Sequence, residues 1–204
     1  MSPFWMQTST GAAIDLLEPL PSSIRLQDIA VALARLPRFT GGTKPNVSVN
    51  VAEHCLLVEQ LAPLGTPPLT RLHLLFHDAH EVITGDISSP LKGALKFLAG
   101  GYDWVGVISR RIQATIEVAA NLPAPTDAEH ALINQFDTEA LVIEKRDCMA
   151  PEPRAWVPLP DVSKQAVMIL PMGASLARAR FKSRALNLLC AANIIPRATF
   201  LEGI

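Results

Sequence analysis

The chain has 204 residues, of which 49% are hydrophobic and 18% are charged, and we expect one domain over residues 1–204 around one apolar core. Its net charge of −1, with no dense Lys or Arg block, argues against a partner of polymeric nucleic acid. No apolar run approaches the roughly 20 residues that cross a bilayer, and the N-terminus lacks the pattern of a signal peptide, so we expect a cytoplasmic protein without a membrane partner.

The N-terminal part of the chain predicts an irregular lead-in followed by two helices. Several prolines surround short apolar groups in the first thirty residues, which is typical of irregular structure. A first helix is expected from near Leu26, where apolar residues begin to recur with a period of 3.6, and Pro37 closes it. A second helix is expected with Ser48 or Asn50 as its cap, and its apolar stripe turns His54 inward.

The next predicted helix, from about Leu69 to Ile83, carries the most informative feature of the chain. The dipeptide His77-Asp78 stands on an otherwise apolar helix that is expected to end at Gly85. Polar groups in that setting cost free energy to desolvate unless they find partners. A bound cation would satisfy them together.

The C-terminal part of the chain predicts more helices and no strand. Pro90 is expected to break the chain before a helix from about Tyr102 to Ala120. A long amphipathic helix is expected over Asp127–Met149, followed by a proline-rich excursion. A last helix from about Gly173 to Ala192 is expected to pack back on the bundle. No segment shows the alternation of a strand, so the predicted fold class is all-α.

Metal-capable side chains occur on three of these predicted helices and can converge in a bundle core. They combine imidazole nitrogen with carboxylate oxygen and include no thiolate, because the three cysteines form no Cys-x-x-Cys pair. Such a ligand set suits Mn²⁺, Co²⁺, Fe²⁺, Ni²⁺, Mg²⁺ or Zn²⁺, and the residues leave the choice of ion open. The candidate ligands are His54, His77, Asp78 and Asp137.

This order of residues, a His, a His-Asp pair and a distant Asp, resembles the HD-domain phosphohydrolases. The likeness is strongest to the bacterial HD-domain 5'-deoxynucleotidases and related phage and prophage HD hydrolases, which add a Glu and a Gly-Asp, as in HDAHEVITGD here. It covers about Asp28 to Met149 and implies an HD-domain helical bundle with its core at about 26–149. It also implies that the four candidate ligands hold one divalent metal ion.

The resemblance also implies roles for carboxylates that follow the doublet. A divalent ion neutralises phosphate charge and lowers the pKa of bound water toward ~7. Glu81 lies on the same predicted helix face as His77 and is the expected acid/base. Asp86, from the Gly-Asp pair, is expected to position the water or the sugar. Both can instead orient the ligands without moving protons.

The expected substrate-binding residues lie in the loops on either side. The resemblance places a phosphate-binding guanidinium at Arg38, which can grip phosphate with two hydrogen bonds, although Arg35 is a nearby competitor. Lys92 is a further phosphate candidate. Phe39 is expected to stack on a base or sugar or to line its pocket.

The other polar residues near these positions fit ordinary structural roles. His73 precedes His77 by four residues, but the zinc-protease pattern needs a Glu directly after the first His and a Leu stands there. His80 replaces a residue that is usually small in the resembled family; a solvated side chain is favoured over substrate contact. A structural ion-pair set at the helix end is expected for Glu144, Arg146 and Asp147.

Together these features predict a hydrolase, a metal-dependent 5'-nucleotidase that releases phosphate from nucleoside 5'-monophosphates, most of all deoxynucleotides. The alternatives are a deoxynucleoside triphosphate triphosphohydrolase, which uses the same metal core, and a non-catalytic HD module that binds a nucleotide. A two-metal signalling phosphodiesterase is disfavoured, because additional His ligands are not evident. Members of the family that this chain resembles are commonly dimers, and the apolar C-terminal helix would suit a homodimer.

Overall fold

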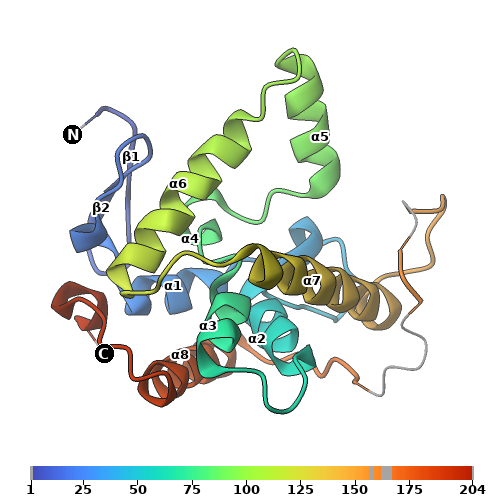
Figure 1. Ribbon diagram of the computed structural model, residues 1–204. Helices are drawn as coiled ribbons and strands as arrows, with labels where there is room; N and C mark the ends of the chain where they lie inside the picture. The colour runs from blue at the N-terminus through green and yellow to red at the C-terminus, as the bar shows by residue number, and fades with distance from the viewer. Residues whose placement is uncertain (1, 157–158, 162–166, 204) are drawn as a thin grey trace.

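The computed structural model describes residues 2–156, 159–161 and 167–203, which form a helical bundle with a small two-stranded sheet (Figure 1). This confirms the predicted all-α class. The longer helices are α1 (Leu26–Leu33), α2 (Val51–Leu61), α3 (Pro68–Phe76), α5 (Ser89–Leu98), α6 (Trp104–Ala119), α7 (Asp127–Cys148) and α8 (Ala174–Ala191). The short elements are α4 (Glu81–Thr84) and the 3₁₀ turns η1 (Pro21–Ser23), η2 (Arg38–Gly41) and η3 (Ala198–Leu201).

The sheet lies in the lead-in that was expected to be irregular. Strand β1 (Trp5–Gln7) pairs in antiparallel register with β2 (Ala13–Asp15), with Met6 opposite Ile14. Each strand has three residues, which is too short for an alternating pattern to stand out in the sequence. Ile14 is buried and joins the main core, so the hairpin is anchored to the bundle.

Helix α8 packs across α1, α2 and α3, as predicted for the C-terminal helix. The centroid of its Phe181 ring lies 5.9 Å from that of Phe76, and the centroid of the Phe200 ring lies 6.4 Å from that of Phe76. These three rings are fully buried. The buried residues of α8 are therefore covered within the chain, and the homodimer stays a prediction.

The helix predicted from Leu69 to Ile83 is interrupted at the His-Asp pair. Helix α3 ends at Phe76, and α4 begins only at Glu81. Between them the backbone forms tighter bonds to the third residue back: Ala79 N donates to Phe76 O at 2.9 Å, and Glu81 N donates to Asp78 O at 3.0 Å. No Gly or Pro lies at this break, so it could not be predicted from the sequence. The predicted end at Gly85 is confirmed, because Gly85 takes a φ of 72° directly after α4.

Pro90, predicted to break the chain, instead lies at the start of helix α5, which begins at Ser89. It occupies the first turn of α5, where its missing N–H would have no helical partner in any case. In Figure 1, α5 and the start of α6 project from the bundle as an arm. None of the α5 residues is buried, and Phe97 on this helix is 84% exposed. Among the described residues, no helix has the length and apolar character required to cross a membrane.

Candidate metal centre

His54 is positioned by the start of α2. Asn50 caps this helix: its side-chain oxygen accepts from Glu53 N at 3.1 Å, and the Glu53 carboxylate accepts from Asn50 N at 3.0 Å. The structure therefore selects Asn50 over Ser48 as the cap. His54 follows one turn into the helix and is fully buried, as its place on the inward stripe predicts.

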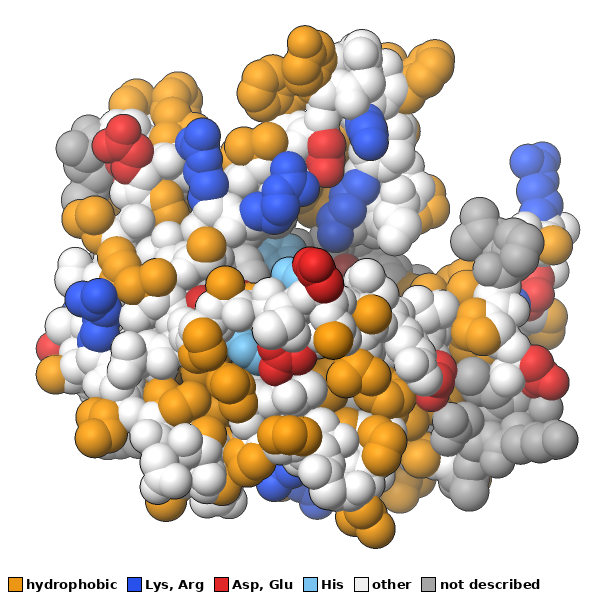
Figure 2. All heavy atoms as spheres, in the orientation of Figure 1, with side chains coloured by type: hydrophobic (Ala, Val, Ile, Leu, Met, Phe, Trp, Pro, Cys, Tyr) orange, Lys and Arg blue, Asp and Glu red, His pale blue; other side chains and the backbone are white. Residues whose placement is uncertain are grey.

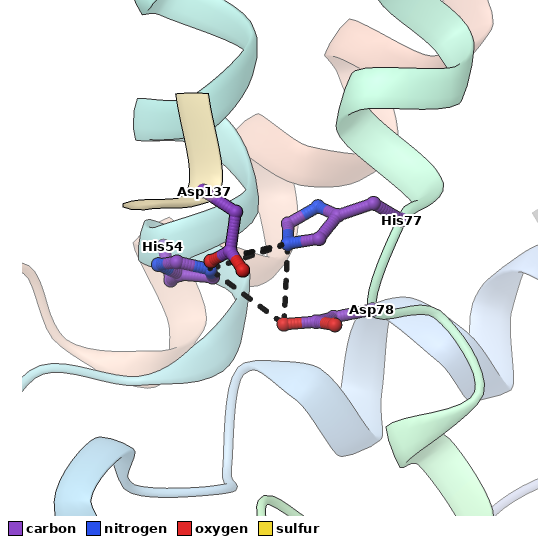
Figure 3. Close-up of side chains that lie close together, drawn as sticks. All are labelled: His54, His77, Asp78 and Asp137. Atoms are coloured by element: carbon purple, nitrogen blue, oxygen red, sulfur yellow. Dashed lines mark hydrogen bonds and ion pairs between the residues drawn. The ribbon is translucent and has the colours of Figure 1, made fainter. Parts of the chain in front are cut away.

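The four predicted ligands meet at one point (Figure 3). Asp137 Oδ1, from α7, lies 3.1 Å from His54 Nε2 and 3.9 Å from His77 Nε2. Asp78 Oδ2, from the turn after α3, lies 3.2 Å from His77 Nε2 and 3.6 Å from His54 Nε2. One ligand atom from each residue lies within 4.8 Å of all the others. The cluster is therefore compact enough to hold one metal ion.

The outer nitrogens of both rings are already held, and this fixes what the inner nitrogens offer. His77 Nδ1 lies 2.9 Å from Leu74 O, and a carbonyl can only accept, so Nδ1 carries the proton. His54 Nδ1 lies 3.0 Å from the carboxylate Oε1 of Glu144 and donates in the same way. In the neutral rings each Nε2 then presents a lone pair, and the two Nε2 atoms are only 3.2 Å apart. Two lone pairs that face each other between two carboxylates require a positive charge, so these donors fit a divalent cation.

The electrostatics of the cluster agree with that reading. Burial and Arg38 lower the pKa of His54, but the carboxylates of Glu144 and Asp137 outweigh them and raise it to about 10. For Asp137 the effect of burial has the opposite sign and raises the pKa. His54 and His77 lower this pKa by more, so its net value lies below the ordinary range. The cluster therefore favours a positive charge between its carboxylates, supplied either by a proton on His54 or by a bound cation.

Glu144 connects the metal ligands to the predicted phosphate-binding arginine. It is fully buried and uses both oxygens: Oε1 holds His54, and Oε2 accepts from Arg38 Nη2 at 3.0 Å and Nε at 3.3 Å. Arg38 Nη1 also lies 3.4 Å from Asp86 Oδ1. Arg35 is exposed to solvent, so Arg38 is the arginine that reaches the site.

Glu144 does not belong to the structural ion-pair set that was predicted for the end of α7, because its partners are His54 and Arg38. Arg146 and Asp147 do form the predicted ion pair, with Arg146 Nε donating to Asp147 Oδ1 at 2.7 Å. Glu144 follows Asp137 by seven residues, two helical turns, and this spacing puts both carboxylates on one face of α7. That spacing was the signal that could have identified it.

The carboxylates of the cluster open into a cavity of about 670 Å³, within the size range of small-molecule sites. Figure 2 shows a hollow below the α5–α6 arm, with histidine side chains at its floor and Lys and Arg side chains along its rim. Asp78 and Asp137 line the cavity, together with every residue predicted to be catalytic or substrate-binding. These residues are Arg38, Phe39, Glu81, Asp86 and Lys92.

Glu81 has the environment of a proton donor. It is 2% exposed, and its Oε2 has no hydrogen-bond partner among the described residues. Burial, followed by the negative charges of Asp78 and Asp86, raises its pKa to about 9. A carboxyl group in this state is protonated at neutral pH.

The remaining histidines stand outside the four-residue cluster. His73 is buried on α3 and is absent from both groups of residues whose atoms lie close enough to share a metal ion among the described parts of the chain. His80, expected to be solvated, is half-buried and lies within 4.8 Å of Asp78 and Glu81. His80 lies in the tight turn that precedes α4, where its backbone N–H donates to Gln113 Oε1 at 3.2 Å.

Comparison with known protein families gives no matching family model. An uncharacterized protein of Rhodobacter capsulatus is 37% identical to this chain over 123 residues. The match covers 59% of this chain and 60% of that relative's length. The relative's name carries no activity, so the geometry must support any functional conclusion. The helical bundle and its His/Asp cluster are compatible with an HD-type domain.

Proposed function

We propose that this protein is an HD-type metal-dependent phosphohydrolase that removes phosphate from nucleoside 5'-monophosphates, above all deoxynucleotides. The observation that carries the proposal is the pair of His54 and His77 Nε2 atoms, 3.2 Å apart, beside the carboxylates of Asp78 and Asp137, which line a nucleotide-sized cavity. A cation bound there supplies positive charge for the phosphate and lowers the pKa of water. The residues around it supply the rest.

The chain's own residues divide the work between binding and proton transfer. Arg38 presents its guanidinium from the cavity wall and Lys92 adds a second positive charge, so both attract the phosphate. Glu81, with its pKa raised to about 9, holds a proton that it can give to the leaving oxygen of the sugar. Asp86 holds the Nη1 side of Arg38 and thereby orients the guanidinium.

The charge of the cavity favours a monophosphate over a triphosphate. Among its described lining residues the only basic side chains are Arg38 and Lys92, while Asp78, Glu81, Asp86 and Asp137 are acidic. A triphosphate carries several more negative charges and needs more cationic partners. The triphosphohydrolase alternative therefore has less support than the monophosphatase.

The experiment is a phosphate-release assay on nucleoside mono-, di- and triphosphates with Mn²⁺, Co²⁺ or Mg²⁺, with phosphate and triphosphate separated as products. We expect inorganic phosphate from monophosphates, and its loss in Asp78→Ala. Asp127→Ala, an exposed carboxylate on α7, is the matched control and should keep full activity. No metal-dependent release from any nucleotide would favour the non-catalytic alternative, and triphosphate as product would favour the triphosphohydrolase.

A further inference from the structure

One part of the cavity lining is aromatic and apolar, and it lies outside the predicted metal and phosphate residues. Trp156, from the segment after α7, faces Phe39 from η2 with ring centroids 6.2 Å apart and planes inclined at 58°. Leu141 of α7 and Leu159 complete this wall. Trp156 was not predicted from the sequence, because a Trp in a proline-rich segment has no periodic pattern to place it.

Both rings are held by neighbouring cations. Lys145 Nζ lies 5.3 Å from the centre of the Trp156 ring and is itself fixed by Glu152 at 2.7 Å. The Arg38 guanidinium carbon lies 5.5 Å from the centre of the Phe39 ring. Phe39 also has a φ of 55°, a left-handed conformation that is unfavourable for a bulky residue. The two rings are therefore positioned by contacts that an ordinary surface aromatic pair would not need.

Helix α7 sets the separation between this wall and the metal centre. Asp137, Leu141 and Lys145 follow one another at intervals of four residues, so they lie on one face at steps of about 6 Å along the helix. Asp137 belongs to the metal cluster, Leu141 lines the cavity, and Lys145 supports Trp156. The aromatic wall thus begins one to two turns from the place where phosphate would bind, as an aromatic group linked to phosphate through a sugar requires.

We propose that Trp156 and Phe39 form a stacking subsite for the nucleobase of the substrate. The inference rests on the proposed nucleotidase function and adds its substrate-recognition element. Every nucleobase has an aromatic face, so stacking tolerates different bases. Purine and pyrimidine monophosphates should therefore both be accepted, whereas a sugar phosphate without a base should not gain from the wall.

The test compares deoxyadenosine 5'-monophosphate with 2-deoxyribose 5-phosphate as substrates of the wild type and Trp156→Ala, both with Mn²⁺. We expect KM for the nucleotide to rise about 10-fold in Trp156→Ala, in line with the measured range for base–aromatic stacking, while the constants for the sugar phosphate stay unchanged. Trp156→Phe, which keeps a stacking face, should restore most of the affinity. Trp104→Ala, exposed on the arm, is the matched control.

The outcomes separate this inference from the proposed function. Nucleotide hydrolysis that Trp156→Ala does not alter, or an equal loss on both substrates, would overturn the subsite and leave the nucleotidase standing. If no nucleotide is hydrolysed, the nucleotidase fails, and the subsite is judged by binding in a Trp5→Phe, Trp104→Phe protein whose remaining tryptophan is Trp156. Quenching of its fluorescence by deoxyadenosine would support the subsite, and unchanged fluorescence would overturn it.

Discussion

Replacing Glu144 by Gln removes one charge and almost no volume, and it tests how the metal ligand and the phosphate-binding arginine are joined. Glu144 gives one oxygen to His54 and the other to Arg38. A glutamine has one oxygen and one NH₂ group, so one of the two neighbours must face a donor. If the NH₂ group faces His54 Nδ1, that nitrogen must accept, and the proton moves to Nε2, where it blocks metal binding.

The magnitude follows from the burial of these groups. The Glu144 side chain is 0% exposed and that of Arg38 is 10% exposed, so the guanidinium loses a partner that water cannot replace. Removing one member of a buried ion pair destabilises a protein by about 3–5 kcal/mol. Asp86, 3.4 Å from Nη1, remains as a second partner, which favours the lower end of about 3 kcal/mol. Loss of the carboxylate that orients a metal-binding His typically weakens metal affinity about 10- to 100-fold.

Two measurements on the Glu144→Gln protein check these values: the free energy of unfolding in chelator by urea denaturation, and the dissociation constant for Mn²⁺ by calorimetry. Glu139→Gln is the control, because Glu139 lies on the same helix and accepts instead from Gln135. The reasoning is refuted if Glu144→Gln matches the wild type in both quantities. Weaker metal binding without any loss of stability would refute the argument about Arg38 alone.

Further predictions concern proton transfer, phosphate binding and stability. Glu81→Gln should lower kcat about 10²- to 10⁴-fold with an unchanged Mn²⁺ dissociation constant, and an unchanged kcat would contradict its role as the acid. Lys92→Met should raise KM for the nucleotide several-fold in steady-state assays, whereas an equal KM would place Lys92 outside the phosphate site. Burial raises the pKa of Glu59, but Arg184 and Arg71 lower it more, to a net value below the ordinary 4.5. The stabilisation by ionised Glu59 is therefore present above about pH 4.5 and lost as the pH falls further. Glu59→Gln should cost about 1–3 kcal/mol at pH 7 in urea denaturation, and this difference should shrink toward pH 3; a constant difference would contradict the assignment.

The sequence predicted those features that depend on residues close together along the chain. The start of α2 follows from the local exchange between Asn50 and Glu53, and the inward direction of His54 follows from helical periodicity. The order of the four ligands predicted their meeting, because helices of a bundle bring their inner faces together. The first two signals can be read within a few residues, whereas the third is a pattern of residue types that extends from His54 to Asp137.

The features that the sequence missed depend on contacts across the fold. The break after Phe76 carries no Gly or Pro, and Pro90 fits a helix start as well as a helix stop. Glu144 acquires its role only through residues that precede it by 90 and 106 positions. Trp156 meets Phe39 only when the chain after α7 returns beside η2. Such pairings are set by tertiary structure and leave no local pattern.

Helix α7 makes the site sensitive to chain length as well as to composition. Asp137, Leu141, Glu144 and Lys145 serve the metal cluster, the cavity wall, the His54–Arg38 link and the Trp156 ring from one continuous helix. Each added residue turns a helix by about 100°. A single-residue insertion between Asp137 and Leu141 would therefore leave Asp137 in place and turn the other three side chains away together. A substitution at one of these positions changes one part of the site, whereas an insertion displaces three parts at once.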